Sequence, residues 1–182
     1  MRKRIINTGR HLPKATWCDV LELRERRNTL VRKPLIRQAK RTGNVFYGGQ
    51  GVNMIVGTNY ERHTHDFDVF SRHPKRHAIE IERGIDRGVN ADLAYVEQTR
   101  YIDRGRANPL FRVKIRPYGD AEVDFNLMPR DIRTTTVKGV RVETLDRAEG
   151  KYKRMLRRGE RGFNANIDLN RIQEYKLNKK RR

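Results

Sequence analysis

Short apolar runs separated by polar turns predict an alternating series of helices and strands along this chain of 182 residues. Residues 19–33 are expected to form a helix capped by Asp19, with Glu22 three positions later as in a capping box. Pro34 ends that helix or opens a second one over residues 34–41. Further helices are expected at residues 50–56, 73–88, 146–158 and 167–182.

Strands are predicted where apolar and polar positions alternate or where a short apolar run lies between turn residues. Such segments are residues 44–47, 66–71, 93–98, 110–117, 121–128 and 139–145. Residues 98–109 show no such pattern and are expected to form a loop. The order of these elements predicts a mixed α/β (α+β) fold, with a single mixed β-sheet and flanking helices.

Charge is distributed unevenly along the chain. Residues 1–43 hold 13 Lys/Arg against 3 Asp/Glu, residues 44–145 hold 16 against 14, and residues 146–182 hold 13 against 5, so the two ends carry +18 of the net +20. We therefore expect one domain over residues 1–182, with a nearly neutral sheet core between basic helical flanks. Such flanks suit a nucleic-acid partner, because phosphate binding releases counterions; charge that only maintains solubility is the alternative.

The sequence also indicates where the protein acts. No apolar stretch approaches the ~20 residues that span a bilayer, and residues 1–17 lack the apolar segment of a secretory signal. Cys18 is the only cysteine, so no intrachain disulfide can form. A cytoplasmic protein, or one encoded by a virus or phage, is expected; the absence of acids before Asp19 leaves organelle targeting open.

Two predicted strands carry carboxylates on one face and apolar side chains on the other. Asp66 and Asp68 share a face because side chains alternate along a strand, and Asp124 lies between Glu122 and Asn126 on the polar face of a later strand. If the two strands are neighbours, Asp66, Asp68 and Asp124 converge. Hard divalent cations, usually Mg²⁺, make such a cluster tolerable.

Two other arrangements of these carboxylates remain open. The two strands can simply be half-exposed, with the acids in solvent. A change of register by a residue or two would place Glu122 or Asp120 where Asp124 is expected.

The adjacent glycines Gly48 and Gly49 follow the predicted strand at residues 44–47 and precede a helix. Without a Cβ atom, the backbone can approach a ligand closely. The helix N-terminus then presents N–H groups to phosphate. A simple turn is the plain alternative, but beside the carboxylates the pair suggests a triphosphate cradle.

Together, "YGGQGVNMIV", "RHTHDFDVF" and "AEVDFN" resemble the nucleotidyltransferase superfamily that includes DNA polymerase β, and most closely its small minimal and abortive-infection types. A Gly-Gly pair opens a helix, an Asp-x-Asp strand follows, and a third Asp lies on a later strand. The segment "VETLDRAEGKYKRML" is similar to the family's strand-to-helix region with a phosphate-binding lysine. The resemblance covers residues 44–156.

The resemblance implies roles for the acidic residues. Asp66 and Asp68 would bind two Mg²⁺ or Mn²⁺ ions, and Asp124 would complete the site of the ion nearer the attacking hydroxyl and help to deprotonate that hydroxyl. All three would thus be catalytic and metal-binding residues.

The same resemblance implies a nucleotide-binding set. Gly48 and Gly49 would hold the β- and γ-phosphates, Arg62 and Thr64 belong to the "R-x-T-x-D-x-D" form of the motif, and Lys151 would neutralise phosphate charge. Lys151 is equally well read as one of several surface cations on a basic helix.

The implied function is transfer of a nucleoside monophosphate from an NTP such as ATP to a hydroxyl, with release of pyrophosphate. The basic flanks favour a nucleic-acid acceptor, RNA rather than DNA, such as the 3′ end of a tRNA; a protein hydroxyl is also compatible. The alternative is a non-catalytic nucleic-acid-binding module of the same fold in a ribonucleoprotein or virion.

Other side chains suggest weaker hypotheses. His63 and His65, in "HTHDFD", resemble part of a zinc-hydrolase motif, but the aspartate comes one position early and no histidine follows. Trp17, Tyr47 and Tyr60 can each stack on a base, although packing within the fold explains them equally well.

Overall fold

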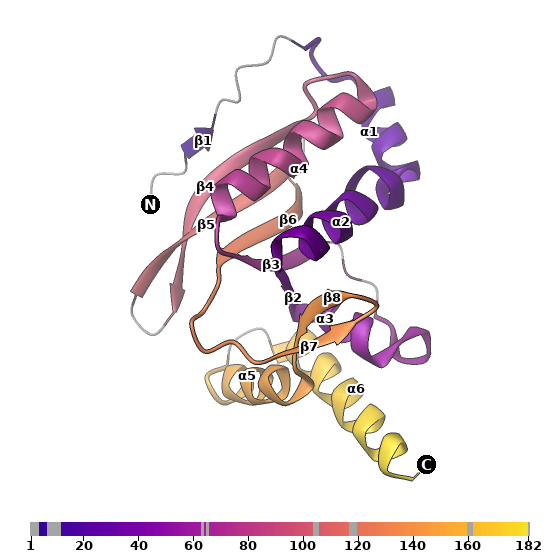
Figure 1. Ribbon diagram of the computed structural model, residues 1–182, viewed down its shortest axis with the longest axis vertical. Helices are drawn as coiled ribbons and strands as arrows, with labels where there is room; N and C mark the ends of the chain where they lie inside the picture. Colours follow the sequence, from indigo (N-terminus) through magenta and orange to yellow (C-terminus); the bar gives the residue numbers. More distant parts are fainter. Residues whose placement is uncertain are drawn as a thin grey trace.

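The β-sheet and its strand order determine where the acidic residues lie. The computed structural model describes residues 4–6, 12–62, 64, 66–103, 106–116, 120–159 and 162–181. Eight strands lie in this part of the chain (Figure 1): β1 (Arg4–Ile6), β2 (Val45–Tyr47), β3 (Phe67–Ser71), β4 (Ala94–Asp103), β5 (Arg106–Ile115), β6 (Asp120–Leu127), β7 (Thr134–Val137) and β8 (Val140–Glu143). They form one sheet in the order β1-β4-β5-β6-β3-β2-β8-β7. The β3–β6 and β2–β8 pairs are parallel and the other pairs antiparallel, so the predicted mixed sheet is confirmed.

Helices flank this sheet, as predicted. The described α-helices are α1 (Trp17–Glu25), α2 (Lys33–Thr42), α3 (Gly48–Val56), α4 (Pro74–Val89), α5 (Leu145–Arg157) and α6 (Gly162–Lys180). A π-helical turn, η1 (Asn28–Arg32), joins α1 to α2, and a 3₁₀ turn, η2 (Thr58–Tyr60), follows α3. Within the described residues, no helix combines the length and apolar character needed to cross a bilayer.

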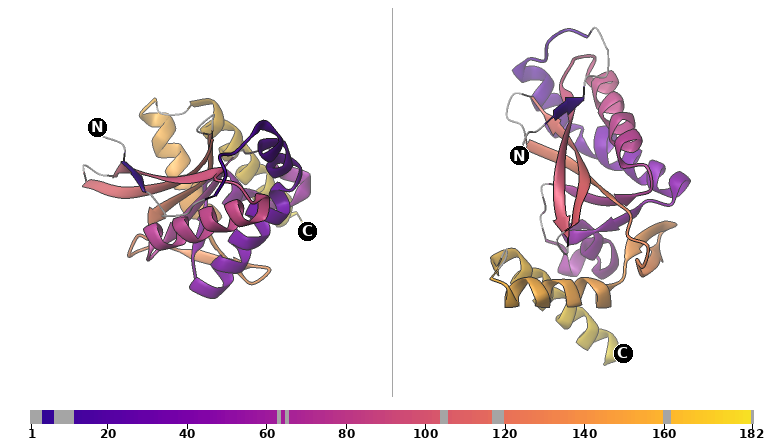
Figure 2. Two further views of the ribbon diagram at one scale, coloured as in Figure 1. Left: turned by 90° about the horizontal axis from the view of Figure 1, so that it is seen from above. Right: turned by 90° about the vertical axis from the view of Figure 1, so that its left-hand side faces the viewer.

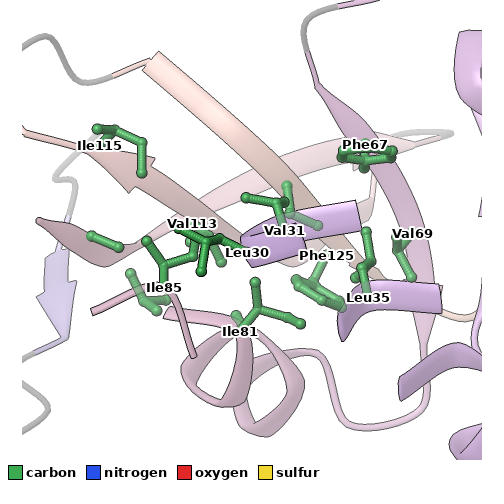
Figure 3. Close-up of a cluster of buried hydrophobic side chains, with 14 of the residues drawn as sticks. Leu30, Val31, Leu35, Phe67, Val69, Ile81, Ile85, Val113, Ile115 and Phe125 are labelled. Carbon is green, nitrogen blue, oxygen red and sulfur yellow. The ribbon is translucent and has the colours of Figure 1, made fainter. Parts of the chain in front are cut away.

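The main core lies between one face of the sheet and the helices α1, α2 and α4. Val69 and Phe125, on neighbouring strands, pack with Leu35 of α2 and Ile85 of α4, and all four are fully buried (Figure 3). Burying each such side chain stabilises the fold by about 1.5–3 kcal/mol. The N-terminal helices therefore contribute side chains to the main core.

A second, smaller core joins the C-terminal helices to α3. Val52 of α3, Tyr152 of α5 and Ile172 of α6 are buried together. Both C-terminal helices lie at the β2–β8 end of the sheet (Figure 1, Figure 2). The basic C-terminal segment is thus anchored beside the helix that begins at Gly48.

The first helix begins earlier than predicted. It starts at Trp17, and its N-cap is Thr16 rather than Asp19. Asp19 instead occupies the third helical position, where its carboxylate accepts hydrogen bonds from the Thr16 N–H at 2.6 Å and the Thr16 hydroxyl at 2.7 Å. Pro34 is the second residue of α2, so it opens a second helix, which is one of the two expected outcomes.

The prediction of a loop over residues 98–109 was wrong. Residues 94–103 and 106–115 form the long antiparallel strands β4 and β5, paired from Ala94 with Ile115 to Asp103 with Arg106. Their outer halves lack the apolar alternation used to predict strands. The short strands β1 and β7, which were not predicted, lie at the two edges of the sheet, where little burial is needed.

His77 is a buried residue of α4, and its ring is hydrogen-bonded within the core. Its Nδ1 lies 2.6 Å from the Ser71 hydroxyl and 3.1 Å from the Asn44 side-chain nitrogen, and the residue is 4% exposed. Since Asn44 donates, Nδ1 accepts and the ring is neutral. Burial lowers the pKa of His77 from its ordinary value. His63 and His65, the two histidines of the zinc hypothesis, lie outside the described residues.

This burial predicts a loss of stability in mild acid. Because the folded pKa of His77 is depressed, the unfolded chain binds more protons below its own pKa of about 6.5, and each pH unit can cost up to ~1.4 kcal/mol. We expect the free energy of unfolding to fall from pH 7 toward pH 5, and to fall less steeply in His77→Gln. Urea titrations at several pH values measure this slope. His73→Gln, at an exposed neighbour, should keep the wild-type slope; the same flattening in both variants would contradict the assignment.

Candidate active site

Asp66, Asp68 and Asp124 meet at the centre of the sheet. Strands β3 and β6 are parallel neighbours with Asp68 directly opposite Asp124, and Asp66 immediately precedes β3. One oxygen from each carboxylate lies within 4.8 Å of the others. Asp124 is 9% exposed, and the other two are half-buried. The local reason is the alternation within each strand, which turns Phe67, Val69 and Phe125 into the main core.

Like charges this close repel strongly. At 4.8 Å, and with an effective dielectric constant near 20, each pair of carboxylates costs about 3 kcal/mol. A set of three carboxylates with no nitrogen or sulfur ligand fits Mg²⁺ or Mn²⁺, which prefer oxygen donors. The residues present therefore suit divalent cations.

Arg112 was not identified from the sequence, although it lies beside the cluster. It is the partner of Asp124 across β5 and β6, and its Nε donates to Asp124 Oδ2 at 3.3 Å. This arginine offsets part of the negative charge of the cluster. The alternation of Arg112 and Lys114 within "LFRVKIRP" was the available signal, but it gained meaning only once the pairing of β5 with β6 was known.

Glu122 does not join the cluster. A bulge between β5 and β6 places Glu122 at a shift in the strand register, since Val113 pairs with Val123 and Lys114 with Ala121. Its carboxylate instead accepts a hydrogen bond from Arg27 at 2.6 Å. The expectation that Glu122 shares the polar face with Asp124 was thus wrong, because one extra residue reverses the alternation.

Gly48 and Gly49 form the turn from β2 into α3, against the carboxylates. Gly48 has φ +66°, and a Cβ atom there would lie 2.1 Å from Asp68 Oδ2. A Cβ on Gly49 would lie 2.7 Å from an Arg62 nitrogen and 2.7 Å from Thr64 Cγ2. The N-terminal turn of α3, whose first N–H groups have no partner within the helix, therefore begins beside Asp68.

Thr64 lies under this turn. The residue is 8% exposed, and its hydroxyl has no hydrogen-bond partner among the described atoms. Such a buried polar atom is costly unless a ligand or water satisfies it. The Thr64 hydroxyl in the predicted phosphate cradle can therefore still form a hydrogen bond.

Arg62 is directed to α6 rather than into open space. Its guanidinium donates to Asp168 at 3.1 and 3.0 Å, and Asp168 also binds Arg171 at 2.6 Å. The side chain of Asn53 holds the Arg62 main chain through both its N–H, at 3.1 Å, and its carbonyl, at 2.7 Å. Arg62 therefore ties the segment before β3 to α3 and α6, a role that the motif alone did not indicate.

Disrupting the hydrogen-bond network around Asp168 should lower the free energy of unfolding. Asp168 is 2% exposed, so Asp168→Asn leaves two guanidinium groups near-buried without their carboxylate, which costs about 3–5 kcal/mol. Urea denaturation followed by circular dichroism measures the loss. The matched control is Asp146→Asn, whose 83% exposed carboxylate pairs with Lys176 and contributes only ~0–1 kcal/mol. Equal small losses in both variants would show that the network is not structural.

Lys151 reaches the same region from α5. Its Nζ lies 4.7 Å from the centre of the Tyr47 ring, and Tyr47 is the partner of Asp68 across β2 and β3. Tyr47 is 8% exposed and stacks on Phe70 at 3.8 Å between ring centres. Tyr47 is thus a packed platform beneath Lys151, whereas Tyr60, beside Tyr175, lies at the α6 contact.

Comparison with known proteins identifies a solved structure with a similar fold. Neither a protein-family model nor a curated protein matches this chain. Among solved structures, the polyadenylate synthase of Megavirus is similar, with a TM-score of 0.57 and 14% sequence identity. The likeness covers 93% of this chain but only 40% of that one, so this chain spans less than half of the length of the viral enzyme. At this identity the comparison establishes the fold.

Proposed function

We propose that this protein is a metal-dependent nucleotidyltransferase that moves a nucleoside monophosphate from an NTP to a hydroxyl. The observation that carries this proposal is the set of three carboxylates within 4.8 Å, beside a glycine turn that a Cβ atom would block. The similar fold of a polyadenylate synthase, an enzyme named for making polyadenylate, supports the same class of reaction.

In this proposal Asp66, Asp68 and Asp124 hold two divalent cations, Mg²⁺ or Mn²⁺. When bound, such ions activate an attacking oxygen and stabilise the leaving one. Asp124, whose carboxylate accepts a hydrogen bond from Arg112, is assigned to the acceptor and takes the proton of the acceptor hydroxyl. The hydroxyl oxygen forms a bond to the α-phosphorus, the bond to the bridging oxygen of the β-phosphate breaks, and pyrophosphate leaves.

The triphosphate side of the site is the glycine turn. The N–H groups at Gly48 and Gly49 and the Thr64 hydroxyl bind the β- and γ-phosphates, and Lys151 neutralises their charge. Arg62 contributes to phosphate binding indirectly. Its guanidinium is bound by Asp168, and Arg62 thereby fixes the segment that carries Thr64. The acceptor is a nucleic acid, in keeping with the net charge of +20. RNA is proposed in preference to DNA because the similar structure is that of a polyadenylate synthase.

A labelling experiment tests the proposal. The protein is incubated with each α-³²P-labelled NTP, Mg²⁺ or Mn²⁺, and total RNA, and label in RNA and in protein is measured separately. Label that appears with at least one NTP and is abolished by EDTA supports transfer. Binding of RNA without transfer from any NTP would overturn the proposal in favour of a non-catalytic binding module.

A further inference from the structure

A groove of about 850 Å³ lies outside the candidate active site, between α4 and the ends of β5 and β6. Its apolar floor includes Ile79 of α4, Phe111 of β5 and Leu127 of β6. Figure 1 shows α4 lying across β4 and β5. Leu127 follows Asp124 by three residues, so its side chain points to the opposite face of the sheet. The groove and the carboxylates therefore occupy opposite faces of the same strand.

The rim of the groove is basic. Lys75, Arg76, Arg83 and Arg87 of α4 line it, and all four are exposed. Glu80 is its one carboxylate among the described lining residues, and that carboxylate forms an ion pair with Arg41. The groove thus presents an excess of positive charge around an apolar floor.

The positive charge of the rim arises because α4 directs two of its acidic residues into the core. Glu82 and Asp86 face the core, each 1% exposed, and the Asp86 carboxylate accepts the main-chain N–H groups of Leu93 and Ala94 at 3.1 and 2.7 Å. Burial raises the pKa of Asp86, and its carboxylate lies in the core, away from the rim of the groove. The near-balance of charges over residues 44–145 therefore conceals a basic outer surface.

We propose that this groove binds single-stranded nucleic acid. Cations on the rim contact the phosphates, and the apolar floor contacts bases and sugars, the combination that single-strand binding requires. The cationic positions from Lys75 to Arg87 span about 18 Å of helix, enough for several nucleotides. Charge complementarity selects a polyanion, and an acidic peptide is the competing ligand that the experiment must exclude.

As the site for an acceptor, the groove rests on the proposed function. Leu127 lies about 10 Å beyond Asp124 along β6, at the end of the strand where the groove opens. A strand held in the groove passes around this end of the sheet and brings its 3′ hydroxyl to Asp124. The groove would then favour long acceptors over very short ones.

Fluorescence anisotropy with a 5′-labelled 12-nucleotide RNA, and with DNA of the same sequence, tests the site without any NTP. The triple variant Lys75→Gln, Arg76→Gln, Arg87→Gln should weaken binding about 10-fold at 0.1 M salt and reduce the slope of log K against log salt by about 2. Leu127→Ala should weaken binding without changing that slope, because it removes no charge.

The matched control is Arg130→Gln, Arg133→Gln, Lys138→Gln, which removes three exposed cations that lie outside both basic flanks and do not line the groove. Equal weakening in the two triple variants, or no weakening in the groove variant, would overturn the groove site. Displacement of the RNA by a 12-residue oligoglutamate at equal concentration would overturn it in favour of an acidic partner. Performing the titrations in the Asp68→Asn protein separates this result from transfer, since binding in the groove needs no catalytic carboxylate.

Discussion

Asp68→Asn should reduce nucleotide transfer at least ~1,000-fold, which corresponds to about 4 kcal/mol of transition-state stabilisation. Asn has the shape of Asp but no charge, and Asp68 lies between the glycine turn and Asp124, where a cation would be shared. Asp66→Asn and Asp124→Asn should show losses of the same order. Initial rates of label transfer at saturating NTP measure the effect, with Asp131→Asn, a 73% exposed carboxylate, as the control.

The same substitution should stabilise the protein when no metal is bound. Three carboxylates within 4.8 Å repel one another, so removing the charge of Asp68 should raise the unfolding free energy by about 1–3 kcal/mol and Tm by ~2–4 °C per kcal/mol. Mn²⁺ should raise the Tm of the wild type but not of the variant. A variant that is both less active and less stable in EDTA would mean that Asp68 is structural, and the metal hypothesis would fail.

Alternation in two strands predicted that Asp66, Asp68 and Asp124 would converge if the strands were neighbours, because the period of two fixes which side chains face the core. The structure supplies that condition, since β3 and β6 pair directly. The same reasoning failed two residues before Asp124, at Glu122. A single bulge shifts the pairing there and directs that carboxylate to Arg27. Bulges depend on the neighbouring strand, so no pattern within "AEVDFN" could reveal this one.

Contacts between distant segments were likewise beyond the sequence. Arg62 and Asp168 are 106 residues apart, and their ion pair exists only because α6 packs against α3. The basic groove could not be predicted for a related reason. A count of charges along the sequence gives Glu82 and Asp86 the same weight as exposed acids, although the fold buries both. Sequence patterns indicate which face of a single helix or strand is apolar. Ion pairs between distant segments and the net charge of a surface depend on tertiary packing.

Gly48→Ala should damage both stability and transfer. A residue with a Cβ atom at φ +66° costs about 1–2 kcal/mol, and the new methyl group would meet Asp68 Oδ2 at 2.1 Å, so the carboxylate or the turn must move. A displacement of about 1 Å at a reacting group can cost ~100-fold in rate. We expect a loss of transfer of about that size or more, measured as kcat/KM for the NTP, and a lower urea midpoint.

Gly57→Ala separates backbone strain from close approach. Gly57 follows α3 with φ +77°, and a Cβ atom there would meet nothing within 4 Å. Its φ of +77° with ψ of −175° is a combination that essentially only glycine adopts, so the substitution carries a backbone strain of about 1–3 kcal/mol, at least comparable to that of Gly48→Ala, without a displaced carboxylate. If transfer falls only in Gly48→Ala, the glycine is required because the backbone must approach Asp68 closely. If both variants lose transfer equally, general destabilisation explains the effect, and the glycine turn loses its place in the phosphate site.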